Sequence, residues 1–431
     1  MKLIYFLLSA PIILLTCKPN RSSQHGTEIT DTCKGSDLTF QIYTPENISP
    51  CKNPPLIMVL DPHADGKLAI SKFKKAADRF SCIVVSSNTI KNNSQDYIAD
   101  INEILEYVKM KHRAGKDIFI AGFSGGARMA INYARYFTVN GVISCGALAP
   151  EQQIKSITGD LYCIVGYADF NFIEAAQFIF SPEKAPSNLY LGFTDDSHQW
   201  PDDHMLEHAL GVLFQHIESK DCASGAIDDF RKSMLSVYDS LISRDKRIEA
   251  ALLARNLSKT GFTRFDQYVA DLEKNPELNS ELNQLRESIR FELAVHNAYY
   301  TALRDEDLVW WESEIASLLK SIETEKDLYK NLALRRIKGF LGIVCYSLVN
   351  NNLRKENLED AKKLLGIYKL IEPENPDMFY FSALYELKTN KKDAARDYLE
   401  KALKAGYKDT IIIENDFPDY YFNLRGITKG S

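Results

Sequence analysis

The sequence lacks the features that mark several large classes of protein. Its 52 Lys and Arg do not outnumber its 58 Asp and Glu, and the formal net charge is -6. A nucleic-acid-binding protein normally presents a strongly basic face, so this balance argues against one. With 45% hydrophobic and 26% charged residues, the composition is that of a folded chain. It excludes a disordered chain, a collagen-like fibre and a polytopic membrane protein.

Paired-cysteine metal motifs are also missing. The chain has eight cysteines, none in a CxxC or Cys/His metal spacing, at positions 17, 33, 51, 82, 145, 163, 222 and 345. Cys33 and Cys51 flank an expected strand in polar surroundings and could pair in an oxidising compartment. If Cys17 is modified, an odd number remains, so at least one cysteine is unpaired or bonded to another chain. Three others lie in apolar runs and are expected to be buried thiols: Cys82, Cys145 and Cys163.

The amino terminus is typical of a targeting segment. Residues 1–16 contain Lys2 and an apolar run that is too short to span a bilayer, which indicates a secretory signal peptide. The run ends Leu-Leu-Thr before Cys17 and resembles a bacterial lipobox, with Thr where Gly or Ala is usual. That resemblance implies a lipidated Cys17 and a polar tether over residues 17–35, with outer-membrane anchoring expected because no Asp follows Cys17. The alternative is plain secretion without a lipid.

The first half of the chain predicts an α/β domain over residues 36–218. Near-continuous apolar runs alternate with amphipathic helical stretches, which is typical of a parallel sheet covered on both faces. The expected strands are residues 38–43, 56–60, 82–86, 118–122, 142–148, 161–167 and 189–193. The expected helices are residues 68–80, 95–112, 125–137, 172–180 and 202–217.

From about residue 224 the periodicity becomes helical, so the expected fold class is an α/β sheet domain followed by an all-α domain over residues 224–431. Ala361 and Leu365 recur 34 residues later as Ala395 and Leu399. This spacing, over residues 342–409, resembles the tetratricopeptide repeat, whose helices pack through small residues. Residues 224–341 repeat poorly and could form a solenoid or a plain helical bundle. The resemblance implies a protein partner for these helices.

The sharpest motif lies at residues 122–126, which read Gly-Phe-Ser-Gly-Gly. It follows an expected strand and precedes a good helix, the context in which G-x-S-x-G forms a nucleophile elbow. Glycines suit this turn because a Cβ would clash with neighbouring elements. The motif therefore predicts Ser124 as a nucleophile, the alternative being a structural turn.

A serine nucleophile needs a base and an acid, and in this topology both follow it, each after a strand. Asp169 follows the strand at 161–167, and His198 follows the strand at 189–193 in a loop that reads Ser-His-Gln-Trp-Pro. Asp160 competes with Asp169 but precedes its strand. With these three residues the chain resembles the α/β-hydrolase superfamily, particularly small secreted esterases and depolymerase-like members.

The resemblance implies a serine esterase with a Ser124-His198-Asp169 triad, acting on a small ester or acyl substrate without a cofactor. An oxyanion needs two backbone donors. Gly125 supplies one by position, and the loop after the strand at 56–60 should supply the other. That loop resembles the oxyanion loop of esterases, with Ala64 where Gly is usual, so the Ala64 amide is the expected donor. Asp61 and Asp65 beside it would disfavour anionic substrates.

Residues 204–208 read His-Met-Leu-Glu-His and match H-x-x-E-H, a zinc-peptidase pattern. A third ligand at a recognisable distance is missing, and the stretch coincides with the expected last helix of the sheet domain. No metal site is therefore expected.

Two functions remain open. The first is a serine hydrolase anchored in the bacterial cell envelope, with helices that dock a partner. The second is a catalytically inactive, hydrolase-like lipoprotein that acts as a binding or scaffold protein through its repeats. Only about a dozen residues separate the strands at 142–148 and 161–167, so no lid domain fits there. The alternative is that the helical half folds back and covers the site.

Overall fold

The computed structural model describes residues 26–48, 53–112, 114–181, 184–217 and 220–418. The expected signal peptide, the lipidation site Cys17 and Cys51 lie outside this range. Within it, no helix is long and apolar enough to cross a membrane.

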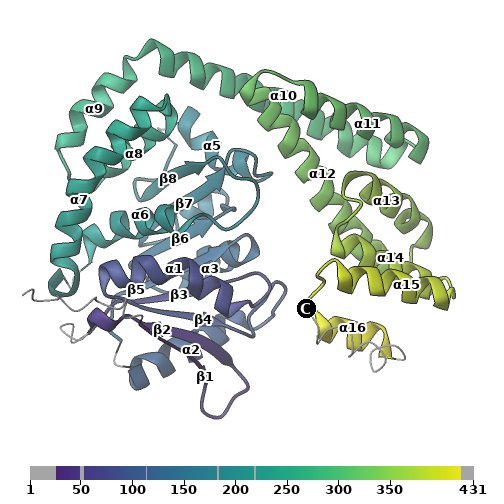
Figure 1. Ribbon diagram of the computed structural model, residues 1–431, viewed down its shortest axis with the longest axis horizontal. Helices are drawn as coiled ribbons and strands as arrows, with labels where there is room; N and C mark the ends of the chain where they lie inside the picture. The colour runs from purple at the N-terminus through teal and green to yellow at the C-terminus, as the bar shows by residue number, and fades with distance from the viewer. Residues whose placement is uncertain (1–25, 49–52, 113, 182–183, 218–219, 419–431) are drawn as a thin grey trace, which may run out of the picture.

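An eight-stranded sheet forms the first part of the chain, with the order β1-β2-β4-β3-β5-β6-β7-β8 (Figure 1). Strands β3 to β8 run parallel, and β2 pairs antiparallel with both β1 and β4. This is the topology of the α/β-hydrolase fold. The strands are β1 (Thr27–Thr32), β2 (Thr39–Thr44), β3 (Leu56–Leu60), β4 (Ile83–Ser87), β5 (Ile118–Phe123), β6 (Gly141–Cys145), β7 (Asp160–Gly166) and β8 (Leu189–Thr194).

Seven of the eight strands confirm the sequence-based prediction to within a few residues. The exception is β1, which occupies residues expected to belong to a polar tether. Its side chains are polar apart from Ile29 and mostly exposed, because β1 lies at the sheet edge and covers no core. A strand without an apolar face has no hydrophobic alternation to reveal it.

Helices cover both faces of the sheet, as the apolar strands predict. In Figure 1, α1 and α6 lie in front of the sheet, and α3 and α5 lie behind it. The helices of this part are α1 (Gly66–Phe80), α2 (Tyr97–His112), α3 (Gly125–Tyr136), the short α4 (Glu151–Ile154), α5 (Phe172–Phe180) and α6 (Asp203–Leu213), with 3-10 turns at Glu46–Ile48 (η1) and Phe214–His216 (η2).

The remainder is all helical and arches around the sheet. It begins on one side of the sheet and ends on the opposite side (Figure 1). These helices are α7 (Lys220–Ser243), α8 (Arg247–Lys259), α9 (Arg264–Glu273), α10 (Pro276–Asp305), α11 (Leu308–Thr324), α12 (Leu328–Arg354), α13 (Leu358–Ile371), α14 (Pro376–Lys388), α15 (Lys392–Lys404) and α16 (Thr410–Asp416).

Two hydrophobic cores divide the arch. Helices α7 to α9 and the first half of α10, as far as Ile289, share one core with the sheet. A second core begins at Tyr299 and extends to Phe417. Helix α12 belongs to both, because Tyr329 contacts the first core and Leu334 the second. The second core contains the small residues that suggested repeats, since Ala361 and Ala395 are both completely buried.

Helix α8 covers the edge of the sheet at β8. The side chain of Asn256 donates to the Leu191 carbonyl (2.8 Å) and accepts from the Leu191 amide (3.4 Å), as another strand would. Lys259 donates to the Leu189 carbonyl at 2.8 Å. An uncovered edge strand is a template for pairing with other chains, and this contact removes that edge.

Buried thiols occur where the sequence predicts them. Cys82, Cys145 and Cys163 are free and buried, and burial raises the pKa of each thiol well above its usual range. Cys33 is also buried, and it forms no disulfide with another described residue. Its expected partner Cys51 is not among the described residues, so their pairing stays a prediction.

The H-x-x-E-H residues on α6 pack against neighbouring parts of the sheet domain and the arch. His208 packs against the rings of Tyr162 and Phe230 at 6.0 and 5.9 Å. Glu207 forms an ion pair with Arg79 of α1. Within the described ranges, no group of three or more His, Cys, Asp or Glu residues could hold a metal ion.

Burial of His208 predicts a pH-dependent stability. Burial lowers the pKa of His208 to about 4, although the charge of Glu207 opposes the shift. Between pH 6.5 and 4 the unfolded imidazole therefore binds a proton that the folded one does not, and the free energy of unfolding falls as the pH falls. We expect this one group to contribute a loss on the order of 3 kcal/mol.

Urea unfolding at pH 7 and pH 4.5 measures this loss. In His208→Phe, which keeps a ring but cannot titrate, the loss between the two pH values should be smaller than in the wild type. The control is His204→Asn, at an exposed position of the same helix, which should behave as the wild type does. An equal loss in His208→Phe and the wild type would contradict the prediction.

Candidate active site

The turn between β5 and α3 holds Ser124 in a strained conformation. Ser124 has φ 52° and ψ -116°, a backbone conformation that residues with a Cβ rarely adopt. Its amide donates to the carbonyl of Cys145 at the end of β6, 2.8 Å away. Strain of this kind persists only where the surroundings enforce it, and it occurs often at functional sites.

Close packing around the turn explains its glycines. A Cβ added to Gly122 would lie 2.3 Å from the carbonyl carbon of Gly126, and one on Gly126 would lie 2.1 Å from the carbonyl oxygen of Leu60. These are backbone atoms that cannot move aside. Gly122 therefore lets the start of α3 pack back against the end of β5, and Gly126 lets the turn fit against the end of β3.

Ser124, His198 and Asp169 form one hydrogen-bonded chain. Ser124 Oγ lies 2.9 Å from His198 Nε2, and His198 Nδ1 lies 2.9 Å from Asp169 Oδ2. Asp169 is 1% exposed, whereas the His198 side chain is 20% exposed. A buried carboxylate on Nδ1 favours the tautomer in which Nε2 can accept a proton from the serine.

Backbone contacts between two loops hold the acid next to the base. Tyr167 and Ala168 donate to the carbonyls of Thr194 and Asp196, at 2.8 and 3.1 Å. The other oxygen of Asp169 accepts from the amide of Asn171 at 2.8 Å. Asp160, the competing acid, is the first residue of β7 and so lies at the opposite end of that strand.

Two aromatic rings enclose the imidazole. The rings of Phe123 and Phe170 lie 4.8 and 4.2 Å from that of His198, centroid to centroid. Phe123 precedes the nucleophile and Phe170 follows the acid, so all three loops contribute to one packed cluster. The sequence analysis did not identify either ring, because an aromatic next to a motif has no distinguishing pattern.

The two expected oxyanion donors, the amides of Gly125 and Ala64, differ in their hydrogen-bond partners. Gly125 is the first residue of α3, where amides have no acceptor within the helix. The Ala64 amide instead donates to the Asp61 carbonyl, 3.1 Å away. The Ala64 amide thus has a partner within its own loop, and its assignment to an oxyanion hole stays a prediction.

Asp61 organises that loop. Its Oδ1 accepts from the amides of His63 and Asp65 at 2.8 and 3.3 Å, and its Oδ2 accepts from Trp200 Nε1 at 3.0 Å. Trp200 is two residues after His198, so this carboxylate joins the loop after β3 to the loop that carries the base. Asp61 therefore connects two loops of the site, a role that the sequence analysis did not anticipate.

A further polar side chain lies beside the nucleophile. A Cβ added to Gly125 would lie 1.8 Å from Asn92 Oδ1 and 2.9 Å from Asn92 Nδ2. Asn92 belongs to the loop after β4, and its amide donates to the Pro62 carbonyl at 2.8 Å. It was missed because a single Asn in a polar loop gives no signal in the sequence.

Comparison with known proteins finds similar solved structures at low identity and low TM-score. No protein-family model and no curated protein matches the chain. A feruloyl esterase module from Clostridium thermocellum is 14% identical, with a TM-score of 0.37 over 44% of this chain and 89% of that one. An α/β serine hydrolase without a lid from Xanthomonas campestris is 19% identical, with a TM-score of 0.35 over 44% and 94%. An α/β serine hydrolase homologue from Coxiella burnetii is 17% identical, with a TM-score of 0.35 over 43% and 96%.

The packing at Gly126 predicts the effect of a single methyl group. Gly126→Ala should destabilise the protein by roughly 1–3 kcal/mol or more, because the Leu60 carbonyl cannot yield without displacing β3. The control is Gly225→Ala on α7, where an added Cβ meets nothing within 4 Å and should stabilise the helix by up to about 1 kcal/mol. Chemical denaturation measures both. Equal stabilities for the two variants would show that the turn tolerates a side chain.

Proposed function

We propose that the protein is a serine hydrolase that cleaves carboxylic esters through an acyl-enzyme on Ser124. The observation that carries the proposal is the chain of two 2.9 Å contacts from Ser124 through His198 to Asp169. A serine hydroxyl is a poor nucleophile at neutral pH and needs a base within hydrogen-bond reach, which His198 Nε2 provides.

Each residue has a role in this mechanism. His198 takes the proton from Ser124 Oγ as the oxygen attacks the ester carbonyl, and Asp169 stabilises the imidazolium that forms. The Gly125 amide, at the positive end of the α3 dipole, donates to the developing oxyanion. His198 then returns the proton to the alkoxide leaving group. Water, activated by the same imidazole, releases the acid and restores Ser124.

The helical arch contacts the loops around Ser124 on two sides. On one side, Gly339 of α12 closely approaches Phe170, the ring next to His198. On the other side, Lys408 and Asp409, just before α16, contact Asp65 (3.6 Å) and Lys91 (2.8 Å). Asp377 of α14 lies near His63, whose charge opposes the rise that burial causes in the Asp377 pKa. We infer that the site favours small esters.

The cellular setting is also a proposal. The signal-like residues 1–16 and the lipobox-like sequence before Cys17 support a protein anchored by lipid in a bacterial envelope, with the helices of the second core docking a partner. The competing function is an inactive, hydrolase-like lipoprotein that acts only as a scaffold. Its support is the Ala64 amide, the expected second donor, which donates to the Asp61 carbonyl within its own loop.

A fluorophosphonate probe decides between the two functions. The chain from Lys18 onward is treated with the probe, and the labelled peptide is identified by mass spectrometry. We expect labelling of Ser124, none in Ser124→Ala or His198→Ala, and a decrease on the order of 10⁴ in ester turnover in Asp169→Asn. Asp160→Asn is the matched control and should keep its activity. A folded protein that is not labelled would exclude the hydrolase.

The contacts before α16 predict a change in substrate size. Exposed ion pairs contribute at most about 1 kcal/mol each, so removing two should loosen the arch without unfolding it. Lys91→Ala with Lys408→Ala should raise kcat/KM for a long-chain nitrophenyl ester roughly two- to fivefold and leave the acetate ester unchanged. Lys109→Ala, which breaks an ion pair within α2, is the control. Equal changes for both esters would show that the arch does not restrict size.

A further inference from the structure

Helix α12 carries a fully buried arginine that contacts the loop of the catalytic acid. Arg336 is 0% exposed, and its Nη1 donates to the carbonyl of Tyr167 at 2.6 Å. Tyr167 directly follows β7 and is two residues before Asp169. The guanidinium also lies over the ring of Phe172, 4.9 Å from its centroid. One side chain of the helical arch thus contacts both ends of the segment that contains Asp169.

A buried partner fixes the guanidinium. Glu292 of α10, also 0% exposed, accepts from Arg336 Nε at 2.8 Å, and its Oε2 lies 2.7 Å from Nη2. Burial raises the pKa of Glu292, and the charge of Arg336 opposes this shift. Behind the pair, His296 stacks on Phe340 at 3.8 Å, and burial together with Arg336 lowers its pKa to about 4. A neutral imidazole adds no second positive charge beside Arg336.

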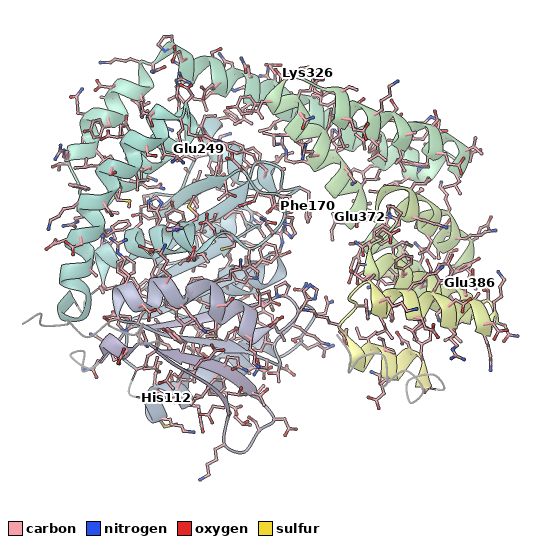
Figure 2. All side chains as sticks on the ribbon, viewed as in Figure 1. His112, Phe170, Glu249, Lys326, Glu372 and Glu386 are labelled. Atoms are coloured by element: carbon pink, nitrogen blue, oxygen red, sulfur yellow. The ribbon has the colours of Figure 1, made fainter. Side chains whose placement is uncertain are left out.

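The same helix contacts the ring that covers the base. A Cβ added to Gly339, three residues after Arg336, would lie 3.2 Å from Phe170 Cδ1, and the Phe170 ring lies on His198. Figure 2 shows Phe170 at the margin of the sheet that faces α12. Residues three and four apart share a face of a helix, so Arg336 and Gly339 approach the acid loop together.

We propose that Arg336 is a positioning residue of the active site, which orders the Tyr167–Phe172 loop and so places Asp169 and Phe170 against His198. This inference rests on the proposed function. It means that the sheet domain alone does not contain its complete site, because the hydrogen bond to the end of β7 comes from the helical arch. The arch is then part of the catalytic unit as well as a candidate docking surface.

The test uses the full chain from Lys18 onward and a pair of substitutions. Glu292→Met with Arg336→Met removes the donor to Tyr167 without leaving an unpaired buried charge, which would itself unfold the protein. Arg336→Lys keeps a charge beside Glu292 but cannot reproduce the planar fork. The matched control is Arg79→Met with Glu207→Met, which removes another interhelical ion pair, between α1 and α6.

Two readouts separate positioning from stability. The first is the rate of Ser124 labelling, with kcat and KM for nitrophenyl acetate, measured well below the melting temperature. The second is the downfield proton signal of the His198–Asp169 hydrogen bond in NMR spectra, which does not require turnover. We expect the Met pair to lower kcat and the labelling rate about 10- to 100-fold with KM nearly unchanged, and to weaken the NMR signal. Arg336→Lys should be intermediate.

Each result decides the inference. A folded Met pair with wild-type labelling, kcat and NMR signal would overturn positioning and leave the hydrolase standing. If the wild type shows the NMR signal but is not labelled, the hydrolase fails, and loss of the signal in the Met pair still supports positioning. An equal loss of kcat in the Arg79 and Glu207 pair would show a general effect of stability and overturn the inference. If the Met pair does not fold, Arg336→Lys is compared with the wild type by the same criteria.

Discussion

The site depends on the close approach of three backbone segments at the carboxyl end of β5. The turn at Ser124 packs against the end of β3 because Gly126 has no Cβ, and α3 packs back on the turn because Gly122 has none. A hydrogen bond from the Ser124 amide to the Cys145 carbonyl joins the turn to the end of β6. That fit holds Ser124 at a positive φ, and the free energy of the strained conformation is offset by packing elsewhere. The loops of Asp169 and His198, which follow β7 and β8, meet this turn from farther along the same sheet. The parallel order of β5, β6, β7 and β8 thus determines which residues can meet.

The helical arch and the sheet domain stabilise each other through shared contacts. The sheet shares its core with the helices as far as Ile289, and Asn256 of α8 bonds both backbone polar groups of Leu191 in β8. Removing the arch would expose this apolar surface and an unpaired strand edge, both of which favour aggregation. The second core, from Tyr299 onward, stands apart and meets the sheet domain mainly through α12 and the segment before α16.

The sequence predicted the fold where the pattern was local and strong. Buried parallel strands are apolar throughout, so their runs were visible, and the elbow motif identified the turn. The polar edge strand β1 had no apolar face and was missed. Asp61 was interpreted as a charge beside the oxyanion loop that would disfavour anionic substrates, yet its carboxylate is a buried acceptor for Trp200 Nε1, 139 residues away. Arg336 was missed for the same reason, since its partners lie 44 and 169 residues away and long-range partners leave no periodic trace.

The buried pair of Glu292 and Arg336 is informative because it is costly. Transferring two charges into the interior costs several kcal/mol per ion, and apolar residues of similar volume often give equal or greater stability. A role in stability alone therefore explains the pair poorly. Apolar side chains cannot supply a donor to the carbonyl of Tyr167, the buried residue that directly follows β7. The arginine satisfies this acceptor from a second element, and its burial fixes the direction of the hydrogen bond. The interface between α12 and the Tyr167–Phe172 loop is therefore under a geometric constraint that packing by itself does not impose.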